Sequence, residues 1–365
     1  MNKKFENMSQ IIEIDGSYGE GGGQIVRTAL ALAAIARKKT IVKNIRAKRS
    51  NPGLRPQHLS ALEAIERISN GKIEGLKVGS STVTYVPGKE LSGGRFGINI
   101  GTAGSVSLVI QCILPVLIFS RSNSEVRISG GTDVKWSPTI DYMKHVFIPD
   151  LKLFGINASL EIIRRGYYPK GGGTVKLYVE PVKKLNSITL SKKPIKSVEI
   201  RSVCSNLPRH VAERQAKAAI AKLGEKGIKV DNVVVEVLSK DKAVARGTSI
   251  VIIGRTEDGL ICGGDSIGEI GKPAEKVGEE AAERFLRWVN SKAAVDIHLG
   301  DMLIPYASLA DSETTYTVDE ITGHIISSLY VEKLILGADY NVQKIDKDLY
   351  EIRIKGLGLQ NEFLS

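Results

Sequence analysis

The feature that most constrains this chain is a glycine-rich loop between a short strand pattern and an apolar helix pattern. A β-type run ends at Asp15, and a helical run covers residues 25–35. Five glycines lie between them: Gly16, Gly19, Gly21, Gly22 and Gly23. Glycine permits positive φ and lets backbone N–H groups approach a phosphate at a helix start. The loop therefore predicts either an anion-binding site or a tight structural turn.

Two charged residues lie in or next to this loop. Glu20 lies among the glycines, and Arg27 falls in the first turn of the predicted helix. A cation at the positive end of a helix is unfavourable by roughly 0.3–1 kcal/mol, so its position favours a bound anion. The spacing is neither G-x-x-x-x-G-K-[ST] nor G-x-G-x-x-G, so neither a P-loop nor a dinucleotide fold is predicted.

The composition limits the class of protein. Lysine and arginine outnumber the acids, 51 to 40, which gives a net charge of +11 in 365 residues. This charge favours a polyanionic partner such as nucleic acid, although a passive basic surface would look the same. Three scattered cysteines indicate buried thiols in a reducing compartment. No apolar run approaches the roughly 20 residues of a membrane span, so we expect a cytoplasmic protein.

Alternating strand and helix patterns predict an α/β fold. The order β-α-β-α-β-β occurs about twice before residue 180, which indicates a repeated unit of roughly 80 residues. Helices are expected at 57–69, 104–119 and 140–154, and a strand at 77–85. The polar residues 1–10 are expected to form a disordered lead-in.

The region after residue 180 predicts an inserted module. Residues 181–194 are lysine-rich and polar, like a linker. Strand patterns at 198–203, 233–237 and 248–255 and a helix pattern at 212–223 follow. We therefore predict a smaller α/β domain at 185–277, inserted into a large domain formed by 11–184 and 278–365. The helix expected at 274–289 and all later residues would return to the large domain.

Two further segments could contact phosphate or bases. Four cations, Arg46, Lys48, Arg49 and Arg55, occupy ten positions around a Pro-Gly turn. Arginine matches phosphate oxygens bidentately, although a solvated basic loop is the plainer interpretation. The segment 164–173 combines three cations, two tyrosines and four glycines. Its aromatic rings could stack on bases, or it could be an ordinary hairpin.

Histidine is scarce, and His324 is the best placed for chemistry. Thr322 is a credible N-cap, which puts His324 in the first turn of a helix. The positive helix end would keep its imidazole neutral and able to attack, although a lone histidine is more often structural. His298, near Asp301, could line a pocket or end a helix. No two histidines have the i, i+4 spacing of a zinc helix, so a structural metal is not expected.

Together these segments resemble the RNA 3′-terminal phosphate cyclases, in particular the catalytically active archaeal and bacterial branch. The similarity covers residues 12–336. It rests on Asp15-Gly-Ser-Tyr-Gly-Glu-Gly-Gly-Gly-Gln-Ile-Val-Arg-Thr28, Pro52-Gly-Leu-Arg-Pro-Gln-His58, Val109-Ile-Gln111-Cys-Ile-Leu-Pro115, Ser129-Gly-Gly-Thr-Asp133, Arg165-Gly-Tyr-Tyr-Pro-Lys-Gly-Gly-Gly173 and the segments around His298 and His324. Their order and joint presence are specific, although no single segment is.

The resemblance implies a fold and a reaction. The fold is three repeated βαβαββ units, as in enolpyruvyl transferases, plus one inserted α/β domain. The reaction is that of an ATP-dependent ligase with three steps. A histidine takes AMP from ATP and releases diphosphate, AMP passes to the RNA 3′-phosphate as RNA-pp-A, and the 2′-OH expels AMP to leave a 2′,3′-cyclic phosphodiester. A homodimer is compatible with it.

The resemblance also implies roles for residues. By position the nucleophile is His324, and Glu20 would hold Mg²⁺ or Mn²⁺ on the triphosphate of ATP. The implied nucleotide-binding residues are Gln24, Arg27, Gln111, His298, Leu299, Gly300, Asp301 and Met302. The residues implied to hold the terminal phosphate and the RNA are Arg46, Arg49, Gln57 and His58.

One position departs from the family, and two other functions compete. The family commonly has glutamine where this chain has Met302, so thioether packing would replace a polar contact to adenosine. One alternative is a non-catalytic, cyclase-like RNA-binding protein of ribosome assembly, but such relatives lack the nucleophilic histidine. The other is a small-molecule transferase of the enolpyruvyl type, which the charge of +11 disfavours.

Overall fold

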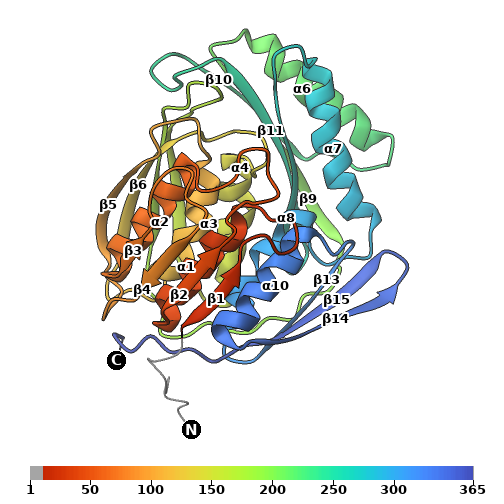
Figure 1. The fold of residues 1–365 in the computed structure, drawn as a ribbon. Coiled ribbons are helices and arrows are strands. Elements are labelled where there is room, and N and C mark those ends of the chain that lie inside the picture. Colours follow the sequence, from red (N-terminus) through yellow and green to blue (C-terminus); the bar gives the residue numbers. More distant parts are fainter. Residues whose placement is uncertain (1–10, 365) are drawn as a thin grey trace.

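Four β-sheets with helices packed between them make up the protein (Figure 1). The structure is a computed structural model that describes residues 11–364. The lead-in predicted at residues 1–10 lies outside the described residues. Strands and helices alternate along the chain, which confirms the predicted α/β class.

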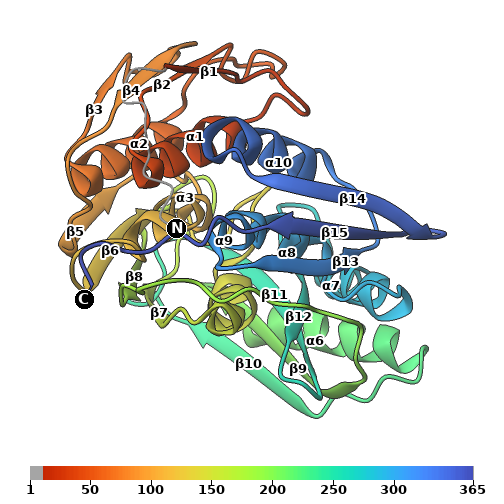
Figure 2. The ribbon, with the colours of Figure 1, turned by 90° about the horizontal axis from the view of Figure 1, so that it is seen from below.

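The first unit follows the predicted order. It consists of β1 (Ile12–Asp15), α1 (Gln24–Ala36), β2 (Thr40–Lys43), α2 (Pro56–Ser69), β3 (Lys72–Glu74) and β4 (Val83–Val86). The sheet order is β1-β2-β4-β3, with β1 parallel to β2 and the other pairs antiparallel. Figure 2 shows α1 and α2 lying along one face of this sheet.

The second unit repeats this topology. It consists of β5 (Gly94–Asn99), α3 (Val106–Leu117), β6 (Ser124–Gly130), a helical stretch at 140–154, β7 (Ala158–Arg164) and β8 (Gly173–Val179). The order β5-β6-β8-β7 matches that of the first sheet strand for strand, with the same parallel pair first. The repeat predicted before residue 180 is confirmed.

A third unit has the same order, but its first strand is reduced to a single bridge. Thr189 pairs in parallel with Thr315, and the Leu190 N–H donates to the Thr315 carbonyl at 2.8 Å. The remaining elements are α8 (Ile297–Met302), α9 (Ile304–Leu309), β13 (Glu313–Val318), α10 (Gly323–Leu336), β14 (Asp339–Asp346) and β15 (Leu349–Lys355). Their sheet has the order β13-β15-β14.

The fourth sheet interrupts the third unit between its first strand and its first helix. It comprises β9 (Ile195–Ser205), α6 (Arg209–Gly224), β10 (Asn232–Leu238), β11 (Gly247–Thr256), β12 (Ile261–Ile267) and α7 (Ala274–Asn290). The strand order is β10-β9-β11-β12. The chain therefore carries an inserted α/β layer, as the sequence predicts.

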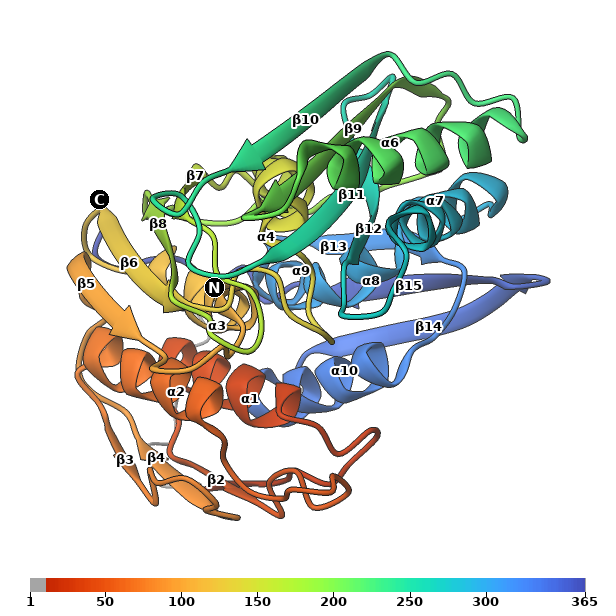
Figure 3. The same ribbon diagram turned by 90° about the horizontal axis from the view of Figure 1, so that it is seen from above.

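The helix α7 differs from the prediction, because it stays with this layer instead of returning to the large domain. It packs along α6 and β12, and Figure 3 shows α6 and α7 side by side. The cause is its apolar stripe of Val277, Ala281 and Phe285, which is buried. The limit expected at residue 277 falls inside α7, and the exact domain limits stay a prediction.

Two other elements differ from the sequence prediction. Of the strand expected at 77–85, only residues 83–85 are extended, as part of β4, and residues 77–82 belong to the loop from β3, which turns through Gly75 and Gly79 at φ of 81° and 82°. The helix expected at 140–154 is broken into an α-turn, a π-helical turn over 143–147, a second α-turn and a 3₁₀ turn. Pro149 lies in this stretch and has no N–H for a regular helix.

The central helix α1 holds the units together. Eleven of its 13 residues are buried, mostly alanine, isoleucine and leucine. It packs against α2, α3 and α10. Because alanine allows close approach of helices, α1 and α10 run side by side (Figure 3). The ends of these two helices then meet near one point on the surface.

A buried ion cluster ties the loops of the second unit. The Arg165 guanidinium lies between two carboxylates, 3.4 Å from Asp133 and 2.7 Å from Asp141. The side chains of all three are almost completely buried. Removing one member of such a cluster leaves uncompensated charge in the interior.

We predict that Arg165→Met lowers the free energy of unfolding by about 3–5 kcal/mol, because two carboxylates then lie buried without a counterion. Urea unfolding followed by circular dichroism measures this. The matched control is Arg209→Met, which breaks an exposed pair with Glu213 and should cost at most about 1 kcal/mol. Equal effects of the two variants would contradict the assigned role of Arg165.

Candidate active site

His324 lies where the sequence predicts, in the first turn of α10. The Thr322 Oγ1 accepts a hydrogen bond from the Ile325 N–H at 3.1 Å, so Thr322 is the N-cap. His324 is the second residue of the helix, and its side chain is 52% exposed. The imidazole is therefore open to solvent at the positive end of α10.

A residue at the start of α1 orients this imidazole. The Nδ1 of His324 lies 2.6 Å from the Oε1 of Gln24. The amide nitrogen of Gln24 donates to the Oδ2 of Asp301 at 3.4 Å, which leaves the amide oxygen facing the ring. An amide oxygen only accepts, so Nδ1 carries the proton and Nε2 carries the lone pair. Asp301, Gln24 and His324 thus form a relay that fixes the tautomer.

The glycine-rich loop folds over the start of α10 and brings Glu20 to His324. The Oε2 of Glu20 lies 3.6 Å from the His324 Nε2 and 3.2 Å from the Arg49 Nη2. A Cβ on Gly323 would lie 2.3 Å from the Glu20 Cγ, so a larger residue at this helix start would displace the Glu20 side chain. The side chain of Lys48 also contacts the loop, with its Nζ 3.0 Å from the Gly19 carbonyl.

The buried side chain of His58 packs against the backbone of the same glycine-rich loop. A Cβ on Gly23 would lie 2.0 Å from the His58 Nε2, so the ring packs directly against the loop backbone. Its Nδ1 accepts the Arg55 N–H at 3.1 Å. Burial, with the charges of Arg27, Arg46 and Arg55, lowers the pKa of His58 to about 2. His58 is therefore a neutral, buried support.

A small cavity lies beside the relay, between α1, α3, α8 and α10. Its lining includes five of the predicted nucleotide-binding residues. They are Gln24, Arg27, Gln111, Asp301 and Met302. The Gln111 amide nitrogen lies 3.6 Å from the Met302 sulfur, a contact that occupies the amide with the residue that departs from the family.

The charges in this cavity are unusual for an interior. Arg27 is only 7% exposed, and burial lowers the pKa of its guanidinium. Burial also raises the pKa of Asp301 to about 6, although His324 and His298 act in the opposite direction. A buried guanidinium next to a helix N-terminus attracts an anion. The cavity is suited to a phosphate group.

The predicted residues 298–300 lie elsewhere. The Nε2 of His298 lies 3.3 Å from the Oδ1 of Asp265, and the ring lines a second cavity with Arg284 and Arg287. The side chain of Leu299 is fully buried, and the carbonyl of Gly300 accepts the Tyr316 hydroxyl at 2.9 Å. The structure therefore brings Asp301 and Met302 to the relay, and separates the other three from it.

The four residues predicted for RNA and phosphate have different surroundings. Arg49 is exposed at the mouth of the site, next to Glu20. Arg46 braces its own loop by donating to the Gly53 carbonyl at 3.0 Å. The Gln57 Oε1 accepts the Ser105 N–H at 3.0 Å, which links α2 to the start of α3. With His58 buried, Arg49 is the member of this set that faces the open site.

The donor set around Glu20 suits a cation that arrives with its ligand. Within residues 11–364, no three histidine, cysteine, aspartate or glutamate side chains gather as a metal site. Mg²⁺ is commonly held by one or two carboxylates together with substrate phosphates. Glu20 alone fits that arrangement and does not fit a resident metal.

The sequence reasoning missed the residue that positions α8. Asp296 caps this helix by accepting the His298 and Leu299 N–H groups at 2.9 and 3.1 Å. It also accepts the Tyr142 hydroxyl at 2.7 Å and the Gly263 N–H at 2.7 Å. An aspartate directly before a helical pattern is an N-cap signal, so this role could have been found.

Comparison with known proteins now identifies the family. A sequence model described as RNA 3′-terminal phosphate cyclase matches residues 18–342. The chain belongs to the RNA 3′-terminal phosphate cyclase family. The proteins of that name from Staphylothermus marinus and Pyrococcus furiosus are each 46% identical to it, covering 96% and 94% of this chain and 99% and 98% of their own lengths. The one from Pyrobaculum aerophilum is 41% identical over 95% of this chain and 99% of its own.

Two further findings accompany the family assignment. The crystal structure of the enolpyruvyl transferase NikO from Streptomyces tendae is 11% identical, with a TM-score of 0.35 over 94% of this cyclase-family chain and 48% of its own, and such a low score carries no inference. Among the described helices, none combines the length and the apolar character that crossing a bilayer requires.

We predict that burial of neutral His58 makes stability pH-dependent. The unfolded chain binds a proton at His58 below about pH 6.5, whereas the native ring does so only near pH 2, so stability falls as the pH drops. Between pH 6 and 4 this residue contributes about 1.4 kcal/mol per pH unit. Urea unfolding at several pH values should show a shallower slope for His58→Asn, which keeps an acceptor for the Arg55 N–H. An unchanged slope would refute the prediction.

Proposed function

We propose that the protein is an ATP-dependent RNA 3′-phosphate cyclase that works through a covalent histidinyl-AMP intermediate. It would convert a terminal 3′-phosphate to a 2′,3′-cyclic phosphodiester, with AMP and diphosphate as the other products. The observation that carries this proposal is the relay of Asp301, Gln24 and His324, in which Gln24 engages the His324 Nδ1 and leaves Nε2 as the nitrogen that can react, beside a cavity lined by the buried Arg27. The names of the relatives support the same reaction.

In the first step, the His324 Nε2 attacks the α-phosphorus of ATP. A P–N bond forms, the bond from that phosphorus to the bridging oxygen breaks, and diphosphate leaves with the electron pair. The ring becomes a cation whose Nδ1–H stays bonded to the Gln24 Oε1. The positive end of α10 favours the phosphate that is then attached to the ring.

Three side chains near the nucleophile would assist with charge. Arg27, buried in the cavity wall, would neutralise phosphate oxygens as negative charge moves during attack. Glu20 and the exposed Arg49 would hold the outer phosphates, Glu20 through Mg²⁺ or Mn²⁺ and Arg49 directly. The cation supplies charge neutralisation on the triphosphate when bound.

The remaining steps use the stored energy of the P–N bond. An oxygen of the RNA 3′-phosphate attacks the adenylyl phosphorus and releases His324, giving RNA-pp-A. The neighbouring 2′-OH then attacks the phosphorus of the RNA 3′-phosphate and expels AMP. This hydroxyl is already adjacent, so the step gains the advantage of an intramolecular reaction. It also requires RNA, because DNA has no 2′-OH.

We predict that ATP labelled at the α-phosphate leaves label on the protein, and that His324→Ala abolishes it, because no other nitrogen is held at this position. The label should survive alkali and be lost in acid, as a phosphoramidate is. Gel autoradiography measures this. The control is His210→Ala, an exposed histidine on α6. Label retained by His324→Ala would sink the assignment of the nucleophile. No label in the parent protein would favour a non-catalytic RNA-binding protein.

We predict that Gln24→Ala slows self-adenylylation about 10- to 100-fold, the value of one hydrogen bond that fixes a tautomer. The rate at saturating ATP should fall far more than the apparent affinity for ATP, because Gln24 acts on the ring of His324. Single-turnover kinetics at varied ATP separate the two effects. A variant that only weakens ATP binding would contradict the relay.

A further inference from the structure

Two large aromatic side chains project from the surface and are largely exposed, with the Lys135 ammonium 6.0 Å from the ring centre of one of them, Trp136. Trp136 is 93% exposed and Tyr168 is 76% exposed. The chain has two tryptophans, and the other, Trp288, is 2% exposed. Aromatic side chains in folded proteins usually bury most of their surface. Two exposed rings on neighbouring loops therefore indicate a binding surface for a ligand.

The loops that carry these rings are tied together and held rigidly. The Thr132 N–H donates to the Gly166 carbonyl at 2.8 Å, and Asp133 forms a β-bridge with Tyr167. The buried guanidinium of Arg165 joins both loops. Exposure of the two rings is therefore a property of an ordered scaffold.

The backbone at Trp136 points to the same conclusion. Its φ is +61°, a left-handed conformation that residues with large side chains rarely adopt. Three residues later, the Thr139 N–H donates to the buried Asp265 Oδ2 at 2.7 Å, which anchors the loop. Strain of this kind persists where surrounding structure imposes it, and it gathers at functional sites.

The surroundings of the two rings are strongly basic. A third loop joins them, because the Arg165 N–H donates to the Lys242 carbonyl at 2.8 Å. Over residues 131–138, 164–172 and 239–246, six exposed cations face one exposed acid, Asp241. The cations are Lys135, Arg164, Lys170, Lys240, Lys242 and Arg246. Lys135 is paired with Glu269 on a facing loop.

These loops also adjoin the candidate active site. A Cβ on Gly171 would lie 2.8 Å from the Ala103 Cα, so the Tyr168 loop packs on the loop before α3. That loop in turn is bonded to α2 through Ser105 and Gln57. The next residue along α2, His58, supports the glycine-rich loop beside His324. This series of contacts links the Tyr168 loop to the candidate active site through the loop before α3 and the start of α2.

We propose that Trp136 and Tyr168 form a stacking platform for single-stranded RNA upstream of the terminal phosphate. The proposal rests on the proposed cyclase function and adds where the rest of the substrate lies. Bases would stack on the two rings while the surrounding cations contact phosphates, a combination that tolerates any sequence. The platform favours single strands, because bases paired in a duplex do not expose their faces.

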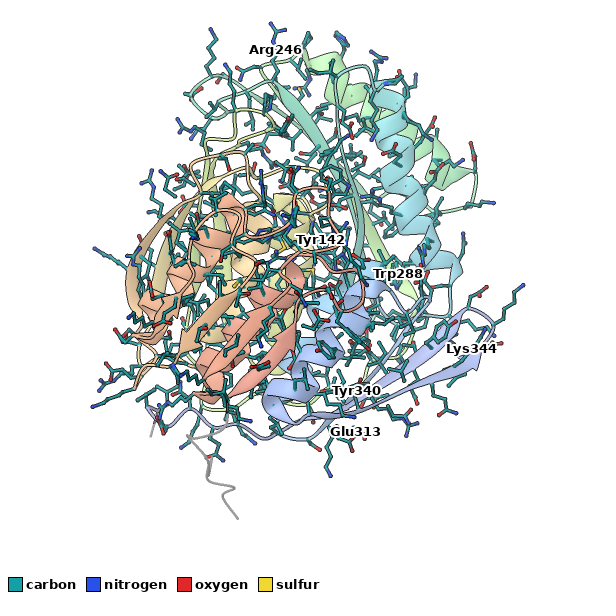
Figure 4. The ribbon with its side chains drawn as sticks, in the orientation of Figure 1. Tyr142, Arg246, Trp288, Glu313, Tyr340 and Lys344 are labelled. Carbon is teal, nitrogen blue, oxygen red and sulfur yellow. The ribbon has the colours of Figure 1, made fainter. Side chains whose placement is uncertain are left out.

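Binding of fluorescent 3′-phosphorylated RNA tests the platform. Trp136→Ala and Tyr168→Ala should each raise the Kd of a ten-nucleotide single strand about tenfold, and leave that of a dinucleotide unchanged. Trp136→Phe should keep tight binding, because it keeps a ring. The matched control is Ile345→Ala, an exposed apolar residue at the tip of the β14–β15 hairpin. Figure 4 shows Lys344, the residue before Ile345, far from Arg246, one of the cations that surround the two rings.

Self-adenylylation of each variant separates this proposal from the function on which it rests. Normal labelling with unchanged binding of the ten-nucleotide strand would overturn the platform and leave the cyclase standing. Absent labelling in the parent protein would overturn the cyclase. Equal loss for the dinucleotide, or equal binding of a duplex, would also overturn the platform. So would sedimentation in which Trp136→Ala dissociates a dimer, because the rings would then join two copies of the chain.

Discussion

The whole site depends on the close packing of α1 against α10. Both helices have small or aliphatic side chains at their contact, which lets their axes lie near each other and their first turns meet. That meeting places Gln24 of one helix against His324 of the other. One amide then does two things, since it orients the imidazole through its oxygen and is itself oriented by Asp301 through its nitrogen.

The charged groups around this contact suit the reversible binding of an anion. A buried guanidinium, the start of α1 and a carboxyl with a pKa of about 6 line the same small cavity. Without an anion, the negative charge of Asp301 partly offsets the burial that lowers the pKa of Arg27. With a phosphate in place, the start of α1 and Arg27 would share its charge. The buried charge of Arg27 therefore destabilises the fold little without an anion, and it would stabilise a phosphate bound in the cavity.

The sequence predicts the local parts of this site and fails where distant segments meet. His324 and its cap were found because Thr322 and the apolar stripe after it are close in the chain. The contact of Gln24 with His324 spans 300 residues and leaves no local signal. His298 was grouped with Asp301 by its place in the motif, but the turn of α8 directs it toward Asp265. The strand and helix pattern showed two repeats, and the third was expected only from the family resemblance, because its first strand is reduced to one bridge at Thr189.

The position of the inserted layer sets an order of assembly. Thr189 pairs with Thr315, yet the fourth sheet and its two helices lie between them in the chain. During synthesis the inserted layer therefore leaves the ribosome before β13 does. Residues 188–190 therefore have no strand partner in their own sheet until β13, in the last quarter of the chain, has been synthesised. Since domains generally fold as units from the N-terminus, the relay that joins Gln24 to His324 closes at the end of folding. His324 therefore gains its orienting contact with Gln24 only when the whole chain has folded.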